Sequence, residues 1–423
     1  MGNYRHRIAD ALLDRKLESA GAVVIEGAKW CGKTSTAEQK AQSTVFLSDT
    51  SHTDYLQMAE LNAALVLEGA TPRLLDEWQL APKLWDAVRH AVDQRQEMGQ
   101  FIMTGSAVPA NLDKIRHTGT GRMAWLTMRP MSLWESGDSS GKVSLKALFE
   151  GAEQIGEAGE ELELEHVAYL TCRGGWPMVT HLRQDAAADV AFNYLDGVIH
   201  SDVQRVDGVS RDADRVKRLL KIYARAQGTQ TTLAKLLKDM QENDLSCSEN
   251  TLLSYLSALR KIFVIEDMTA WNPNLRSRTA VRTASTRYFV DPSIATASLG
   301  LGSKDLINDL NTFGLLFETL CIRDLRVYAQ AVNGEVYHYR DKNGLECDAV
   351  VHLRNGQYGL VEIKLGGERL IEEGASSLRT LAEKIDTTKM PKPSFLAILT
   401  ATGQYAYTRP DGVHVIPVYM LKD

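Results

Sequence analysis

One short stretch constrains the fold of this chain more than any other, because it reads G-x-x-x-x-G-K-T. Its residues are Gly27, Ala28, Lys29, Trp30, Cys31, Gly32, Lys33 and Thr34. The apolar run 22–25 comes directly before it and predicts a buried strand, and residues 34–42 predict a helix directly after it. In that setting the backbone N–H groups of the loop and the positive end of the helix form an anion site. The stretch therefore predicts an ATP-binding P-loop, in which Lys33 contacts the β- and γ-phosphates and Thr34 holds Mg²⁺.

An acidic pair downstream completes this prediction. Leu74 and Leu75 are followed by Asp76 and Glu77, between forty and fifty residues after the P-loop. At the end of a strand, this pattern is typical of a Walker B motif, in which Asp76 binds the Mg²⁺ water shell and Glu77 polarises the attacking water. An acidic pair that starts a helix is the alternative.

A third strand is predicted over 101–106, ending in small polar residues. In additional-strand ATPases the strand between the two Walker strands ends in a polar side chain that senses the γ-phosphate. Thr104 or Ser106 fits that role, and an N-cap by Ser106 is the alternative.

Composition limits the remaining possibilities. The chain has 423 residues, which predicts two to four domains, and its 44% hydrophobic and 24% charged content is typical of a soluble globular protein. The net charge of −6 gives no overall basic field, so nucleic acid would have to bind a local patch. Five scattered cysteines without a C-x-x-C pair argue against a zinc site and favour a reducing compartment. Without a signal-peptide core or a membrane-spanning run, we expect a cytoplasmic protein with no membrane contact.

The middle of the chain changes character near residue 210. Apolar spacing predicts three successive helices, within 216–224, 233–237 and 248–259, followed by strands at 263–265 and 288–290. Three helices and then a β-ribbon is the order of a winged helix. Residues 201–290 hold 15 Lys and Arg against 10 Asp and Glu, and the predicted wing contains Arg276, Arg278, Arg282 and Arg287. This favours contact with DNA phosphates, with oligomerisation or packing as the alternative role.

A second chemical constellation lies in the last 110 residues. A predicted helix over 313–328 carries Glu318, a strand over 345–352 carries Asp348, and a strand over 360–364 carries Glu362 and Lys364. This is the order of the PD-(D/E)xK nuclease fold. Asp348 and Glu362 would bind Mg²⁺ or Mn²⁺, and Lys364 would orient or deprotonate a water.

Two questions about this constellation stay open at the level of sequence. Glu318 would add a ligand or support one, and Glu346 could take the place of Asp348. The alternative to an active nuclease is a nuclease fold retained as a DNA-binding or structural platform.

The order of the motifs resembles one family of proteins. Residues 4–7, the P-loop with its Lys-Trp-Cys, 74–79, 103–106, Gly121-Arg122 and 129–135 together resemble bacterial and archaeal AAA-type ATPases that end in a nuclease-like domain. The resemblance implies an additional-strand ATPase that forms a homo-oligomer, with a hexamer as the form typical of such ATPases. It also suggests Arg122 as an arginine finger, with Arg116 and Arg129 as rivals and a surface salt bridge as the alternative.

The predicted architecture is therefore a multidomain α/β chain. An AAA-like ATPase domain is expected over 1–200, a winged helix over 201–295 and a PD-(D/E)xK nuclease-like domain over 296–423. The expected function is ATP-driven DNA processing by a metal-dependent nuclease. The alternative is an ATP-dependent switch or scaffold, or a DNA-binding regulator, with an inert nuclease-like domain.

Overall fold

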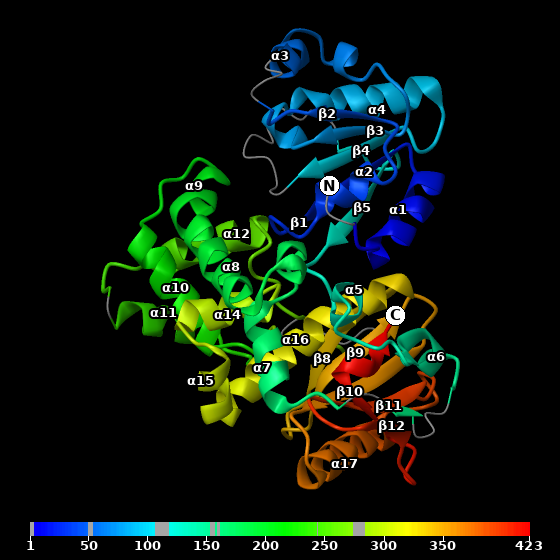
Figure 1. The fold of residues 1–423 in the computed structure, drawn as a ribbon, viewed down its shortest axis with the longest axis vertical. Helices are drawn as coiled ribbons and strands as arrows, with labels where there is room; N and C mark the ends of the chain where they lie inside the picture. The colour runs from blue at the N-terminus through cyan, green and yellow to red at the C-terminus, as the bar shows by residue number, and fades with distance from the viewer. Residues whose placement is uncertain are drawn as a thin grey trace. The chain divides into compact units, whose positions relative to one another are not determined.

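The structure is a computed structural model and describes residues 4–49, 54–105, 118–152, 157–158, 161–242, 244–273 and 284–423. The chain divides into two compact units (Figure 1). The first comprises Met1–Pro130, Gly197–Asp212 and Ser254–Val264, and the second comprises Met131–Asp196, Ala213–Leu253 and Ile265–Asp423. The three-domain division at 200 and 295 stays a prediction.

The first unit contains a five-stranded parallel sheet in the order β2-β3-β4-β1-β5. Its strands are β1 (Ala22–Gly27), β2 (Ser43–Phe46), β3 (Arg73–Asp76), β4 (Phe101–Gly105) and β5 (Met123–Met128). β4 lies between β1, which precedes the P-loop, and β3, which ends in Asp76. This confirms the additional-strand arrangement expected from the sequence.

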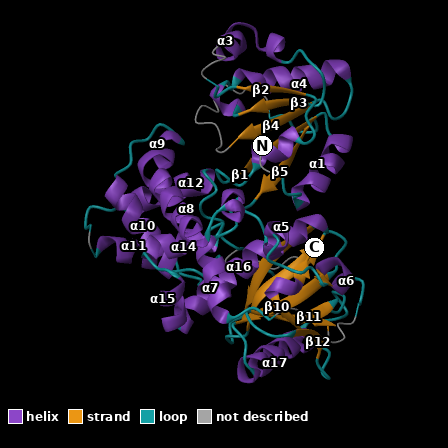
Figure 2. Cartoon of the chain, viewed as in Figure 1, coloured by secondary structure: helices purple, strands orange, loops and turns teal. Residues whose placement is uncertain are grey.

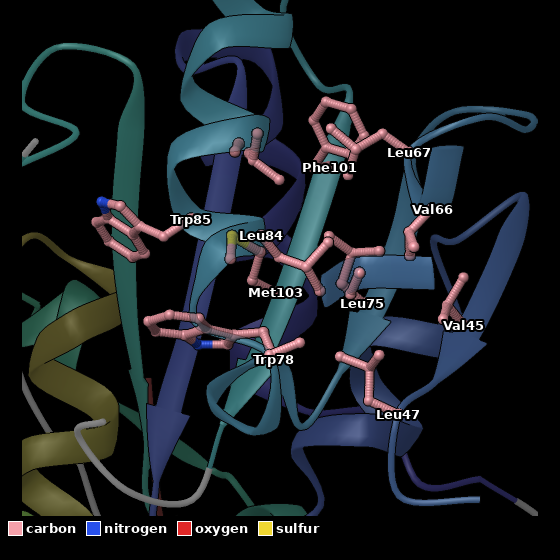
Figure 3. Close-up of a cluster of buried hydrophobic side chains, with 14 of the residues drawn as sticks. Val45, Leu47, Val66, Leu67, Leu75, Trp78, Leu84, Trp85, Phe101 and Met103 are labelled. Carbon is pink, nitrogen blue, oxygen red and sulfur yellow. The ribbon is translucent and has the colours of Figure 1, made fainter. Parts of the chain in front are cut away.

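Helices cover both faces of this sheet. They are α1 (Ile8–Ser19), α2 (Lys33–Glu38), α3 (Asp54–Val66, interrupted at Asn62), the 3₁₀ helix η2 (Trp78–Leu80) and α4 (Lys83–Arg95). Alternate residues of each strand enter different cores. Val24, Leu75 and Met103 pack with Trp78, Leu84 and Trp85 on one face. Figure 3 shows this cluster, with Leu75 and Met103 beside Trp78 and Leu84. Val23, Leu74 and Ile102 pack against Leu12, Leu13 and Ala37 on the other. Burial on both faces explains why these strands read as continuous apolar runs.

The rest of the first unit is helical. A π-helical turn, η5 (Val198–Asp202), leads into α9 (Val203–Arg205). Arg211 is buried beside them, where it pairs with Asp207 at 2.7 Å and donates to the Val203 carbonyl at 2.9 Å.

Helices dominate the first half of the second unit (Figure 2). They are α5 (Leu133–Ser136), α6 (Leu145–Phe149), α7 (Leu164–Arg173), the 3₁₀ helix η4 (Pro177–His181), α8 (Gln184–Gly197), α10 (Ala213–Arg225), α11 (Leu233–Gln241), α14 (Pro292–Leu299), α15 (Ser303–Asn308) and α16 (Leu310–Ala331). α12 (Glu249–Lys261) begins in this unit, and its residues from Ser254 on belong to the first unit. α10, α11 and α12 confirm the three predicted helices. Instead of a continuous ribbon after them, the described residues show isolated antiparallel bridges at Ile265–Phe289 and Met268–Thr286.

A seven-stranded sheet fills the C-terminal part of the second unit, in the order β7-β12-β13-β11-β10-β9-β8. Its strands are β7 (Glu157–Ala158), β8 (Gly334–Arg340), β9 (Glu346–Leu353), β10 (Tyr358–Lys364), β11 (Phe395–Thr400), β12 (Tyr405–Thr408) and β13 (His414–Pro417). β8, β9 and β10 are antiparallel neighbours, whereas β10 and β11 are parallel.

The parallel connection from β10 to β11 runs through α17 (Glu368–Lys384), which lies against the sheet (Figure 1). Its Leu378 and Leu381 are buried with Leu360 and Ile398 of the strands. A short parallel pair, β14 (Leu421–Lys422) with β6 (Val143–Ser144), forms a separate two-stranded sheet. Among the helices described, none combines the length and apolar character needed to cross a bilayer.

A buried charge network holds the middle of the second unit together. Arg323 of α16 pairs with Asp291 at 3.0 Å and with Asp324 at 2.7 Å, and all three side chains are at most 2% exposed. Asp291 also accepts the Gly175 N–H at 2.9 Å, and Asp324 accepts the Leu133 N–H at 3.0 Å. The turn that contains Gly175, between α7 and the 3₁₀ helix η4, is therefore held by the same buried network.

Replacing Arg323 with Met is expected to lower the free energy of unfolding of the second unit by roughly 3 kcal/mol, because Asp291 and Asp324 would remain buried without a counter-charge. Urea denaturation measures this loss. Arg340→Met is a matched control, because Arg340 is 46% exposed and its pair with Glu346 should contribute less than about 1 kcal/mol. Equal losses in the two variants would contradict this assignment.

Candidate functional site

The P-loop begins where β1 ends, and its shape depends on two glycines. Gly27 has a φ of +146°, and a Cβ at that position would lie 2.0 Å from the Met128 carbonyl oxygen of β5. Gly32 has a φ of +99° and is the N-cap of α2. Both positions therefore need a residue without a side chain, and the loop turns directly into the first turn of α2.

Lys33 lies inside the loop. Its Nζ donates to the carbonyl oxygens of Gly27 at 2.9 Å and Ala28 at 2.8 Å, and the side chain is buried. Cys31 is also fully buried, with its Sγ 3.6 Å from the Met128 carbonyl, so its thiol fills the space between the loop and β5. The ammonium group is thus held at the place where the loop encloses a phosphate.

Contacts from outside the motif hold the loop. The Arg7 guanidinium donates to the Cys31 carbonyl at 2.7 Å and to the Arg129 carbonyl at 2.9 Å, and so joins the loop to the end of β5. Lys29 pairs with Asp202 of η5, within the same unit. Trp30, with a φ of +62°, remains exposed. No pattern in the sequence indicates these anchoring roles of Arg7 and Asp202.

The predicted magnesium side of the site is assembled around Asp76. Its Oδ1 accepts hydrogen bonds from the Thr34 hydroxyl at 2.7 Å and from the Thr104 hydroxyl at 2.6 Å. Asp76 and Thr104 are paired across β3 and β4, which explains why two segments far apart in sequence meet here. A carboxylate and a hydroxyl beside the phosphate loop are oxygen donors of the kind that Mg²⁺ prefers.

Glu77 is held by a residue that the sequence reasoning missed. Its backbone is left-handed (φ 56°, ψ 42°), and its Oε2 accepts a hydrogen bond from the Gln79 amide. Gln79 Oε1 is buried without a hydrogen-bond partner among the described residues. Gly105 leaves room for it, because a Cβ there would lie 2.7 Å from that oxygen. Gln79 therefore fixes the carboxylate that would polarise the attacking water.

The candidate arginine fingers occupy different positions. Arg122 Nε pairs with Asp93 Oδ1 at 2.7 Å, and its carbonyl accepts the Ala22 N–H at the start of β1, at the end of the strand opposite to the loop. Arg129 follows the end of β5, beside the loop. Arg116 and Ser106 lie outside the described residues. The role of Arg122 toward a neighbouring subunit stays a prediction.

The second constellation forms a single cluster. β9 and β10 pair with Ala349 opposite Val361, so the next pair in the same register is Asp348 and Glu362. Lys364, two residues further along β10, places its Nζ 2.6 Å from Glu362 Oε2 and 3.3 Å from Asp348 Oδ2. Asp348 Oδ2 also accepts the Ile363 N–H at 2.8 Å. Asp348 and Glu362 are fourteen residues apart in the sequence, and they face each other because β9 and β10 form a hairpin.

Glu318 of α16 joins the same cluster. Burial raises its pKa well above the usual range, and the charge of Asp348 raises it further. Burial, and then the charge of Asp348, raise the pKa of Glu362 to about 8. Burial alone would lower the pKa of Lys364, but the charges of Asp348 and Glu362 raise it above its ordinary value. Three carboxyl groups therefore share this site with one lysine, and the raised pKa values of Glu318 and Glu362 favour their protonated, neutral forms.

Whether this cluster fits a metal ion can be judged from its donors. In the described part of the chain, no group of three or more His, Cys, Asp or Glu side chains is arranged to hold one. The Lys364 ammonium is bonded to both Asp348 and Glu362. Carboxylate oxygens are donors of the kind that Mg²⁺ and Mn²⁺ prefer, but in this arrangement they hold an ammonium group. Glu346, the alternative ligand, is exposed and pairs with Arg340 at 3.0 Å.

The raised pKa of Glu362 predicts a pH effect on stability. The unfolded chain releases this proton near its ordinary value of 4.5, whereas the folded chain keeps it up to about 8. Between these two pH values the folded state binds more protons than the unfolded state, so the free energy of unfolding falls as the pH rises. The stabilisation from this proton is therefore complete below pH 4.5 and is lost once the pH has risen through 8. Glu362→Gln should remove this slope, and should be more stable than wild type at pH 8.5 in EDTA. Urea titrations at pH 5.5 and 8.5 test this, and parallel pH profiles would contradict it.

The predicted basic patch is partly wrong. Arg287 is 7% exposed, pairs with Asp267 at 2.7 Å and donates to the Thr231 carbonyl at 3.0 Å, so it cannot contact a DNA phosphate at the surface. Arg287 is buried because it lies between two segments of the chain, one that carries Asp267 and one that carries Thr231. Arg276, Arg278 and Arg282 lie outside the described residues.

Three family models match successive parts of the chain. Residues 19–136 match a family described as AAA domain. Residues 164–305 and 313–421 each match a domain of unknown function, DUF8612 and DUF4143 respectively. Two curated relatives, uncharacterized proteins of Mycobacterium bovis and Mycobacterium tuberculosis, are each 23% identical over 361 residues, which cover 85% of this chain and 73% of theirs.

Solved structures give weaker similarities. A Walker-type ATPase of Pyrococcus abyssi is 13% identical, with a TM-score of 0.43, over 68% of this chain and 94% of its own. The replication initiator DnaA, bound to AMPPCP and single-stranded DNA, is 14% identical, with a TM-score of 0.29, over 61% of this chain and 90% of its own. Because both scores are low, the assignment rests on the sequence match and on the geometry of the loop. Residues 19–136 form an AAA-type P-loop ATPase-like domain.

Proposed function

We propose that this chain is an ATPase that couples ATP binding and hydrolysis to metal-dependent cleavage of DNA. The observation that carries the proposal is the cluster of Glu318, Asp348, Glu362 and Lys364, in the same chain as a complete P-loop. Ionisable groups with strongly shifted pKa values that share one site cluster at functional positions of proteins. The proposed domain limits are 1–200 for the ATPase, 201–295 for a winged helix and 296–423 for the nuclease-like domain.

In the ATPase domain each side chain has a proposed role. Lys33 leaves the Gly27 and Ala28 carbonyls and binds the β- and γ-phosphates of ATP. Thr34 and Asp76 hold Mg²⁺, which supplies charge neutralisation on the phosphates when it is bound. Glu77 orients the attacking water, and Gln79 fixes the Glu77 carboxylate. Thr104 senses the γ-phosphate through its hydroxyl, which is hydrogen-bonded to Asp76. Arg122 acts as the arginine finger toward a neighbouring copy in a homo-oligomer, for which a hexamer is proposed.

In the nuclease-like domain the topology supports the proposal. The order α16, β8, β9, β10, α17, β11 places the carboxyl groups on α16, β9 and β10, as in the PD-(D/E)xK arrangement. Asp348 and Glu362 would hold Mg²⁺ or Mn²⁺, which stabilises the pentavalent phosphate and acidifies a water when it is bound. Lys364, once separated from the two carboxylates, orients that water. α10, α11 and α12 would position the DNA.

A second candidate function is an ATP-dependent switch or scaffold with an inert nuclease-like domain. One observation favours it: the Lys364 ammonium is already bonded to both Asp348 and Glu362, as in a structural ion-pair cluster. In this case ATP would control a partner or a DNA site without any bond cleavage.

A cleavage assay separates the two functions. Linear, single-stranded and branched DNAs are incubated with the full chain and Mg²⁺ or Mn²⁺, with and without ATP. Cleavage that depends on the metal ion supports the nuclease. ATP hydrolysis without cleavage under either metal ion would contradict it and favour the switch.

A further inference from the structure

The helix α10 concentrates positive charge in a chain that is acidic overall. Its 13 residues include five Lys or Arg side chains and one Asp, a balance of +4, whereas the whole chain has a net charge of −6. A protein without an overall basic field attracts a polyanion only through a local patch of this kind.

The two sides of α10 differ in burial and in charge. The helix packs against α14 and α11. Its buried side chains are all apolar or aromatic, namely Val216, Leu219, Leu220, Ile222, Tyr223 and Ala224. Lys217, Lys221 and Arg225 are exposed instead. Because they recur every four residues, these three side chains, here called the basic row, lie along one side of the helix.

The other two cations of α10 have a structural partner. Arg215 pairs with Asp244 at 2.6 Å, and Arg218 lies 3.7 Å from the same carboxylate. Within the described residues, no ion pair joins the basic row to an acidic side chain. Asp214, the one acidic residue of the helix, lies in the first turn and precedes the row. The charge of the basic row is therefore not used to hold the fold.

The length of the basic row suits a nucleic-acid backbone. At about 1.5 Å per residue, the distance from Lys217 to Arg225 is roughly 12 Å along the helix axis. One strand of duplex DNA carries a phosphate for about every 3.4 Å of its axis, so about three phosphates lie along the same length. Three cations can thus face three phosphates of one strand.

The exposed side of α10 lacks what a protein or a membrane would require. Protein interfaces depend on aromatic or apolar anchors, and helices that bind membranes insert apolar side chains into the bilayer. Every residue of α10 is described, and none of its large apolar side chains is exposed. Charge without an apolar anchor favours the phosphates of DNA as the partner.

We propose that the basic row of α10 binds successive phosphates of a DNA strand, whatever the base sequence. This surface replaces the wing predicted from the sequence, in which Arg287 is buried. The inference rests on the proposed DNA-processing function and deepens it, because it names the surface that holds the DNA. Contacts of this type position a protein on DNA without reading its bases.

A triple variant with Lys217→Gln, Lys221→Gln and Arg225→Gln tests the proposal, because glutamine removes the charge and keeps a good helix propensity. Fluorescence anisotropy of a short labelled DNA duplex, measured in EDTA at several KCl concentrations, gives the slope of log K against log salt. Each lost phosphate contact should make this slope shallower by about 0.9, so the triple variant should lose about 2.7. Two duplexes of unrelated sequence should be affected equally.

The matched control removes three exposed charges from other elements, with Lys146→Gln, Arg369→Gln and Lys389→Gln. These side chains are 69%, 78% and 72% exposed. The control variant has the same net charge as the α10 variant, and it should keep the salt slope of wild type. An equal loss of slope in both variants would overturn the proposal, because net charge and not the basic row would then be responsible.

The remaining results separate this proposal from the function on which it rests. If wild type binds DNA and the α10 variant keeps the same slope, the basic row is wrong and the DNA-processing function stands. The same holds if wild type cleaves DNA with Mn²⁺ but does not bind it in EDTA. If wild type neither binds nor cleaves DNA, both are wrong. Displacement of the labelled DNA by polyglutamate as readily as by unlabelled DNA would indicate an acidic protein as the partner, and would also overturn the proposal.

Discussion

Lys33→Ala is expected to reduce ATP hydrolysis by about a thousandfold, the scale of effect seen when a preorganised charge stabiliser is removed. The Lys33 ammonium is buried inside the loop and bonded only to loop carbonyls in the described structure, at 2.8 and 2.9 Å. No other lysine or arginine of the motif has its side chain in that position, because Lys29 is paired with Asp202. Phosphate release from ATP in the presence of Mg²⁺ measures the effect.

The control for this variant is Lys40→Ala. Lys40 follows α2 within the same segment, but it is partly exposed and pairs with Asp14 at 2.7 Å. It should hydrolyse ATP at the wild-type rate. Loss of activity in both variants would mean that general destabilisation, and not the phosphate contact, is responsible, and wild-type activity in Lys33→Ala would contradict the assignment of the loop.

Lys364→Ala is expected to reduce DNA cleavage by about a thousandfold, since it removes the one cation that contacts both Asp348 and Glu362 and that would orient the water. ATP hydrolysis should be unchanged, because the P-loop lies in the other compact unit. Gel analysis of cleaved DNA with Mg²⁺ or Mn²⁺ measures the first quantity, and phosphate release measures the second.

Lys384→Ala provides a comparison for this variant. Lys384 lies at the end of α17 and pairs with Asp341, and it is 44% exposed. Its loss should leave cleavage intact. Cleavage by Lys364→Ala at the wild-type rate would exclude the proposed role of Lys364, even if the nuclease activity itself were real.

The sequence predicted the ATPase domain well, because its signals are local. The P-loop, Asp76, Glu77 and Thr104 each stand at the end of an apolar run, and parallel strands bring such ends to one edge of a sheet. β5 was missed because Met123–Met128 contains Trp125, which is 49% exposed, and lacks the continuous apolar pattern of the other strands.

The residues that support the nucleotide site could not be predicted. Arg7 and Gln79 act through hydrogen bonds to partners that are set by the fold, and nothing in their neighbouring sequence marks those contacts. Charge was also a poor guide, because Arg287 read as a surface cation but is buried against Asp267. By contrast, the sequence spacing of Asp348 and Glu362 correctly predicted that they lie on neighbouring strands of a hairpin, since the register of a hairpin is set locally by its turn and its apolar pattern.

The most direct test of the account is the rate of DNA cleavage by the full chain with Mn²⁺, measured with and without ATP, for wild type, Lys33→Ala and Lys364→Ala. We predict that wild type cleaves DNA, that ATP changes its rate, that Lys33→Ala cleaves at a rate that ATP does not alter, and that Lys364→Ala does not cleave. DNA left intact by wild type while ATP is hydrolysed would contradict the coupled nuclease, as would cleavage that responds to ATP equally in wild type and Lys33→Ala.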